Sequence, residues 1–375
     1  MQWRSTLLLA WGPCLAGLAP PAAAQPVLGY DLDAMVSAPG GGPDLGAAPQ
    51  QVEPGEQYPP TERDRSLSPT PPPPTAPPPR RTEWSLRLDA SAVADSNITN
   101  ATDRETIPVE QGGEALPVPL DPALRERSSL GFGASASAAA DVPLSPTASL
   151  AADVEAYYLD HEGDRTDDGS VLVALGPEFS WGPSTQAALQ VIAFQRWYGG
   201  ETANRGLGVR GRLRQRIAER RHVTLRIDAR VFESGYGELF GGSQASAYLS
   251  YEALLGPDLA ASLGAYGRRE WLEADRFSST DFGTYGALNH FVGRGFAVGV
   301  SGGVSRVTYD APILFLSPDE RRDWRVYASA YVMMRRPLLL GLIPSLTYTY
   351  NRTSSSILFY RADRHRLRLG LSRTF

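Results

Sequence analysis

Cysteine, histidine and long apolar runs are all scarce in this chain of 375 residues. The single cysteine, Cys14, lies in an N-terminal segment that we predict to be cleaved, so the mature protein would carry no thiol, no disulfide and no cysteine-bound metal. The four histidines form no pair with metal-site spacing. After the N-terminal segment, no run of about eighteen apolar residues suggests a transmembrane helix. These absences leave two classes, a soluble exported protein or a β-barrel.

Signals of catalysis are also poor. Nothing in the sequence marks a nucleophile or a general base, and no zinc motif is present. An acidic stretch at 160–168 has some character of a calcium site, but it lacks the ligand pattern of an EF-hand, and a solvated loop is the simpler interpretation. We therefore predict a protein that is not an enzyme, with no catalytic residues, no cofactor, no metal and no nucleic-acid partner.

The first 24 residues have the three parts of a secretory signal peptide. Arg4 supplies the positive start, residues 7–18 form a short apolar core, and alanines 22–24 precede Gln25. The apolar core is too short to span a bilayer as a helix. We expect export and removal of residues 1–24.

Residues 25–81 differ in composition from the rest of the chain. They include three glycines at 40–42 and a proline-rich run at 69–79, with almost no aromatic residues. Such a segment buries too little apolar surface to offset its ordering entropy, so we predict a disordered linker in the periplasm. A proline-rich ligand for a partner domain is the alternative.

From residue 82 onward, apolar and polar residues alternate. Trp84, Leu86 and Leu88 alternate with Ser85 and Arg87, and this period of two is typical of a strand with one apolar face. Fourteen segments show the pattern, an even number as bacterial single-chain barrels have. They are 84–92, 130–142, 150–158, 171–181, 186–197, 207–217, 223–232, 245–255, 259–271, 281–291, 296–307, 324–333, 338–350 and 364–375.

The predicted connections alternate in length. Short turns fall at 143–146, 182–184, 219–221, 256–258, 292–295 and 335–337, and longer polar loops at 95–127, 160–169, 199–206, 233–243, 272–279, 308–322 and 351–359. A soluble β-sandwich gives no reason for this alternation. We predict an all-β fold in which residues 82–375 form a transmembrane antiparallel up-and-down barrel of about 14 strands, with both termini in the periplasm.

The last strand resembles the assembly signal of bacterial outer-membrane barrels. Leu367, Leu369 and Leu371 form its apolar face, and the chain ends on the aromatic Phe375. Arg373 falls on the same face, which is acceptable only near a membrane interface. This resemblance implies a location in the outer membrane of a Gram-negative cell, with membrane lipid and the barrel assembly machinery as partners.

Arginines are concentrated on the other face of two neighbouring strands. Arg210, Arg212, Arg214 and Arg216 alternate with apolar residues in one strand, and Arg226 and Arg230 do so in the next. Arginine facing lipid at mid-bilayer would cost about 2–4 kcal/mol, so these side chains are predicted to line the lumen. Two interpretations are open. Either carboxylates of neighbouring strands neutralise the arginines, or only Asp228 lies nearby and a positive wall attracts anions.

Two segments resemble a known family, the surface lipoprotein assembly modifiers (Slam proteins). In that family a D-S-N-I-N-x-A-T-like stretch follows the first strand, and residues 95–102 read D-S-N-I-T-N-A-T, with Thr99 in place of asparagine. The family's barrel closes on Y-x-x-N-x-S-N-I-x-x-Y followed by R-x-R-V-x-L-G-L-x-R-x-F. Residues 345–360 and 364–375 are similar to that pattern, with Ser356 in place of its asparagine.

The resemblance implies a fourteen-stranded outer-membrane protein that helps move lipoproteins or soluble cargo proteins to the cell surface. Members usually carry an N-terminal domain of tetratricopeptide repeats, and the proline-rich residues 25–81 do not fit such repeats. We therefore expect a separate periplasmic partner, or a barrel adapted to another role. The alternatives are a small-solute channel that prefers anions and a passive structural barrel.

Overall fold

The computed structural model describes residues 82–111, 114–162, 166–182, 184–256, 258–292, 295–334 and 341–375. The predicted signal peptide and proline-rich linker, residues 1–81, lie outside these described residues. Within the described ranges, no helix has the length and apolar character needed to cross a membrane.

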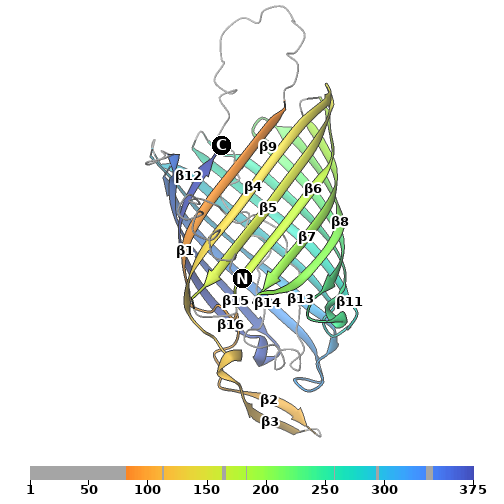
Figure 1. The fold of residues 1–375 in the computed structure, drawn as a ribbon, viewed down its shortest axis with the longest axis vertical. Coiled ribbons are helices and arrows are strands. Elements are labelled where there is room, and N and C mark those ends of the chain that lie inside the picture. The colour runs from red at the N-terminus through yellow and green to blue at the C-terminus, as the bar shows by residue number, and fades with distance from the viewer. Residues whose placement is uncertain are drawn as a thin grey trace, which may run out of the picture.

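Fourteen antiparallel strands form a closed barrel in which each strand pairs with its neighbours in the chain, and the last strand pairs with the first (Figure 1). This confirms the predicted fold class and strand number. The strands are β1 (Glu83–Asp95), β4 (Ser129–Ser145), β5 (Ala148–His161), β6 (Asp168–Trp181), β7 (Thr185–Tyr198), β8 (Glu201–Ala218), β9 (Arg221–Ser234), β10 (Gly242–Leu254), β11 (Leu259–Leu272), β12 (Ser279–Val292), β13 (Phe296–Pro312), β14 (Glu320–Met334), β15 (Ile343–Ser355) and β16 (Ala362–Thr374).

A small hairpin projects from one end of the barrel, opposite the end where the C-terminus lies (Figure 1). It consists of β2 (Thr106–Gln111) and β3 (Glu114–Pro119), which pair only with each other. Within the described residues, the connections at this end include the single-turn 3-10 helices η2 (Pro122–Leu124), η3 (Glu238–Phe240) and η5 (Leu358–Tyr360). We call this the long-connection end.

Alternation along each strand places apolar side chains outside and polar ones inside. On β8, Leu207 and Val209 face outward and expose 59% and 50% of their surface. The next residue, Arg210, faces the opposite side and exposes 8%. On β9, Val231 is exposed and Arg230 is buried. The bare apolar set is the surface that a bilayer would cover.

Exposed aromatic residues lie near both ends of this apolar band. Trp84, Trp181, Phe296 and Phe375 lie near the short turns, and Trp197, Trp271, Phe282 and Trp324 lie toward the long-connection end. Aromatic girdles of this kind mark the two membrane interfaces of transmembrane barrels.

Some connections differ from the prediction. The expected loop 199–206 is a two-residue turn, because β8 begins at Glu201 and pairs with β7 at once. Gly199 and Gly200 both have positive φ, as two-residue hairpin turns require. The predicted turn 335–337 and the predicted strand start at 338 lie outside the described residues, which resume shortly before β15 begins at Ile343. At the β7–β8 hairpin, the outward apolar pattern stops at the edge of the membrane. The backbone pairing of the two strands continues beyond that edge.

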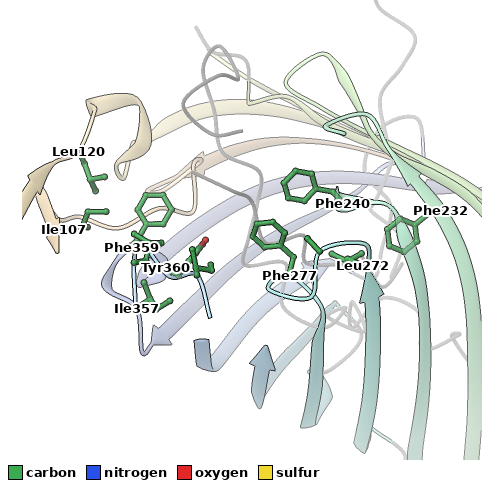
Figure 2. Packing of buried hydrophobic residues seen from close by; sticks show 12 residues of the cluster. Ile107, Leu120, Phe232, Phe240, Leu272, Phe277, Ile357, Phe359 and Tyr360 are labelled. Carbon is green, nitrogen blue, oxygen red and sulfur yellow. The ribbon is translucent and has the colours of Figure 1, made fainter. Parts of the chain in front are cut away.

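Most of the buried apolar core lies at the long-connection end, where the connections fold together (Figure 2). We call this group the mouth cluster. Its members are Ile107, Leu120, Phe232, Phe240, Leu272, Ala274, Phe277, Ile313, Leu316, Ile357, Phe359 and Tyr360. Phe240 and Phe277 stack with ring centroids 5.0 Å apart. The connections of β9 through β16 are thus joined by apolar packing to the hairpin strand β2.

A charge on the outer face should destabilise the barrel far more than the same charge inside. Val300 faces outward on β13 between the two girdles and is 54% exposed. We expect Val300→Arg to lower the free energy of unfolding by about 2–4 kcal/mol, measured by urea titration in lipid vesicles. Ser301→Arg, one residue along and facing the lumen, is the control. Equal losses in both variants would contradict the assignment of the two faces.

The last residue should act in assembly. The backbone of Phe375 exchanges hydrogen bonds of 2.9 and 3.3 Å with Leu86, and its exposed ring lies under the Arg373 guanidinium at 4.4 Å. Deletion of Phe375 is expected to reduce the amount of barrel inserted in the outer membrane, scored by heat-modifiable migration on gels. Phe375→Trp, which keeps an aromatic end, should insert normally. Full insertion of the shortened chain would argue against an assembly signal.

Candidate functional site

The arginines predicted from sequence line the inner wall of β8 and β9. Three of them surround one buried carboxylate, Asp228, which is 1% exposed. The distances from Asp228 oxygens to side-chain nitrogens are 3.1 Å for Arg210, 3.2 Å for Arg230 and 3.7 Å for Arg226. The Arg226 guanidinium also lies 4.4 Å from the ring centroid of Tyr248 on β10. Asp228 is therefore the centre of a compact ionic cluster.

Asp228 is not the only counter-charge nearby, which corrects the expectation drawn from the sequence. Arg212 binds Glu178 on β6 at 2.6 Å, and Arg214 reaches Glu252 on β10 at 3.5 Å. Both pairs skip one intervening strand, because the concave inner wall brings side chains of next-but-one strands together. Arg216, farther along β8, is exposed near the short-turn end.

Sequence reasoning missed a second set of ionic contacts. Arg196 makes two hydrogen bonds of 2.9 and 2.8 Å to Asp168, and Arg268 binds Asp281 at 2.7 Å. Arg321, Asp323 and Arg325 also occupy alternate positions of one strand. The reasoning that predicted lumen-facing arginines on β8 could therefore have predicted that these three side chains face the lumen.

The three β14 side chains form the most buried part of this network. Arg321 makes two bonds to Asp323, at 3.0 and 2.6 Å, and Asp323 also lies 3.7 Å from Arg325. The Arg321 guanidinium lies 3.4 Å from the ring centroid of Tyr360, a member of the mouth cluster, and 4.5 Å from that of Tyr309. Arg321 thus connects the ionic network to the apolar packing above it.

Positive and negative groups are balanced in the buried interior of the described residues. Seven arginines and seven carboxylates are buried there. The arginines are Arg196, Arg210, Arg230, Arg268, Arg321, Arg325 and Arg364, and the carboxylates are Asp89, Asp95, Asp168, Asp228, Glu270, Asp281 and Asp323. Of the two interpretations left open by the sequence, this balance favours a neutralised structural network over a positive wall.

A third site lies where the first and last strands meet. Asp95, at the end of β1, accepts hydrogen bonds of 3.0 and 2.7 Å from Arg364 and one of 2.9 Å from Arg366, both on β16. Asn97 donates from its Nδ2 to the backbone oxygens of Asp363, at 3.0 Å, and Ala101, at 2.9 Å. We call Asp95, Asn97, Arg364 and Arg366 the seam clasp.

The seam clasp unites the two segments that carry the family resemblance. The D-S-N stretch supplies Asp95 and Asn97, and the R-x-R stretch supplies Arg364 and Arg366. Along the seam, β1 forms nine residue pairs with β16, compared with thirteen with β4. The clasp holds one end of this shorter pairing, and the contact between Phe375 and Leu86 holds the other.

The first long connection packs against the clasp. Thr99 donates from Oγ1 to the Asn97 side chain at 3.1 Å and to the backbone oxygen of Arg125 at 2.8 Å. Burial raises the pKa of Glu126, and the carboxylates of Asp103 and Asp363 raise it further. The connection that carries β2 and β3 is therefore fixed to the seam through the D-S-N stretch.

Glycine motifs in the barrel do not have the context that chemistry requires. Residues 299–303 match Gly-x-Ser-x-Gly but lie within β13, not on the strand-to-helix turn of a nucleophile elbow. Residues 206–211 match Gly-x-Gly-x-x-Gly but lie within β8, with no helix after them. Among the described residues, no group of acidic, histidine or cysteine side chains could hold a metal ion.

Removing the charge of Asp95 should weaken the seam. Asp95→Asn leaves two arginines facing a neutral amide, and Arg364 is itself buried, so the free energy of unfolding should fall by about 3–5 kcal/mol. Urea titration in detergent micelles measures this loss. Asp141→Asn on β4, which accepts one hydrogen bond from Ser149, serves as control and should lose about 1 kcal/mol. Similar losses in both variants would rule out a special role for the clasp.

Several solved structures align with most of this chain at low sequence identity. The outer-membrane channel DcaP of Acinetobacter baumannii aligns with 79% of this chain and 98% of its own, at 10% identity and a TM-score of 0.43. A Pseudomonas aeruginosa FadL homologue aligns with 79% of this chain and 90% of its own, at 9% identity and a TM-score of 0.45. Pseudomonas aeruginosa OccK3 aligns with 78% of this chain and 95% of its own, at 11% identity and a TM-score of 0.39.

A family comparison is more informative. No curated protein matches the chain, but the family model described as surface lipoprotein assembly modifier matches residues 84–375. The match runs from the first residues of β1 through the last residue of the chain, and so includes the lumen network, the mouth cluster and both halves of the seam clasp. The chain therefore belongs to the surface lipoprotein assembly modifier family.

Proposed function

We propose that this outer-membrane barrel helps deliver lipoproteins or soluble cargo proteins to the cell surface. The observation that carries the proposal is the family match across the whole barrel, residues 84–375. In this proposal the short turns and the termini face the periplasm and the long-connection end faces outward. Cargo then enters from the short-turn end and meets the mouth cluster last.

Two features disfavour the alternative of an anion-preferring channel. The buried arginines of the described interior are matched by an equal number of buried carboxylates, so these buried residues give no excess of positive charge to attract anions. The mouth cluster also packs the long connections together with Phe240 and Phe277 fully buried. An open pore for small ions needs neither feature, whereas a barrel that opens only for cargo needs a closed resting state.

A display assay tests the proposal. A candidate exported lipoprotein is produced in a Gram-negative cell with and without the barrel, and its digestion by protease added to intact cells is measured. Digestion should require the barrel, while the total amount of lipoprotein stays the same. Surface exposure of the lipoprotein without the barrel would refute delivery.

Charge reversal in the lumen should separate delivery from ion conduction. Arg212→Glu with Arg214→Glu places new carboxylates beside Glu178 and Glu252. Because like charges then repel across the inner wall, we expect reduced display of cargo with normal barrel insertion. Adding Glu178→Arg and Glu252→Arg re-forms both pairs and should restore display.

The same variants have a second readout in planar bilayers. Weak, unselective conductance before and after the Arg212→Glu and Arg214→Glu changes is the expected result for a delivery barrel. A clear anion preference that reverses in the variant would instead support the channel alternative.

A further inference from the structure

A groove of about 1270 Å³ indents the outer wall of the barrel across β6 to β11, near the long-connection end. Its floor consists of outward-facing apolar side chains, of which Val173, Leu207 and Val231 are 42%, 59% and 62% exposed. Trp271, part of the aromatic girdle on that side, also lines it. The groove is wide and open, and it faces the lipid side of the barrel wall.

Close packing of the strands shapes this part of the wall. A Cβ atom added to Gly206 would lie 2.1 Å from the Val231 carbonyl oxygen, and one added to Gly242 would lie 2.0 Å from that of Trp271. Neither position has room for a side chain, so both require glycine. On the inner side, Phe232 and Leu272 of the same wall pack into the mouth cluster. The groove is thus built into the barrel by the same strands that support the mouth cluster.

The rim of the groove is polar and carries more negative than positive charge. Arg205 and Glu233 form an exposed ion pair at 3.1 Å, and Glu273 and Asp275 add two further carboxylates. Arg269, whose guanidinium lies 5.5 Å from the Trp271 ring, is paired with Asp310. A ligand seated in the groove therefore meets apolar surface below and an acidic rim above.

These properties define the ligand chemistry. The floor lies within the apolar band, where acyl chains are the surrounding medium, and the tryptophan marks the level of the interface. The acidic rim repels phosphate, so lipid A and other phosphate-bearing lipids are a poor match. A lipid whose chains join through neutral ester and amide groups fits both the floor and the rim.

We propose that this groove binds the acyl chains of the lipid anchor of an exported lipoprotein. The inference rests on the proposed function and its orientation, which put the groove in the outer leaflet. A lipid-anchored cargo must keep its chains in the bilayer while its protein part crosses, because burying acyl chains in a charged lumen is unfavourable. The outer groove gives the anchor a place beside the barrel at the leaflet where delivery ends.

Photocrosslinking tests the proposal directly. The full chain in lipid vesicles is illuminated with a synthetic triacylated lipopeptide that carries a diazirine in mid-chain, and the labelled residues are mapped by mass spectrometry. We expect labelling centred on Val173, Leu207 and Val231. Filling the floor with Val173→Trp and Val231→Trp should reduce it about tenfold, whereas Val300→Trp, an outward valine on β13 away from the groove, should match the unaltered chain.

Competition on the unaltered chain provides a result that does not depend on the variants. An excess of unlabelled lipopeptide should suppress labelling in the groove, and lipid A should not. Uniform labelling around the barrel, stronger competition by lipid A, or full labelling of an inserted filled variant would each overturn the inference.

The display assay separates this inference from the proposed function. If display requires the barrel but is unaffected by an inserted Val173→Trp and Val231→Trp variant that still crosslinks normally, the groove inference fails and delivery stands. If the groove is labelled specifically but display never requires the barrel, the lipid site stands and delivery fails.

Discussion

The structure depends on guanidinium–carboxylate pairing inside the barrel. All 36 basic residues of the chain are arginine and none is lysine. The planar guanidinium can bind both oxygens of a carboxylate at once, as Arg196 does with Asp168 and Arg321 with Asp323. An unpaired charge at such positions would be costly. Each pair joins specific register positions, so the pairs also favour one alignment of the strands over any slipped alternative.

Much of this barrel was predictable from alternation alone. Arg210 lies an odd number of residues from Leu207 and Val209, so it must face the opposite side of the strand. Once the leucine and valine are assigned to the lipid face, the face of every other side chain in the strand is determined. The partners were not predictable. Arg212 and Glu178 are 34 residues apart on strands that are not adjacent, and only wall curvature and tilt bring them together.

Strand ends and the seam show two further limits of the sequence. Polar residues 201–206 were expected to be a loop, yet they continue β8, since strands can extend past the membrane and hydrogen-bond in water. The paired glycines before them were the available turn signal. At the seam, resemblance identified the D-S-N and R-x-R stretches, but not that they touch. Contact between segments so distant in sequence follows from barrel closure and not from any local pattern.

The seam clasp has a consequence for how the protein folds. Asp95 and Arg364 are 269 positions apart, so their contact must await all the strands between them. Until it forms, β1 and β16 each present an unpaired edge, and every unsatisfied backbone group in hydrocarbon costs several kcal/mol. The entropy cost of closing a chain grows only with the logarithm of its length. The long separation of the two residues therefore slows formation of the clasp more than it lowers the stability of the closed barrel. An almost complete barrel is thus an unstable intermediate, and the ring gains much of its stability in a single final step.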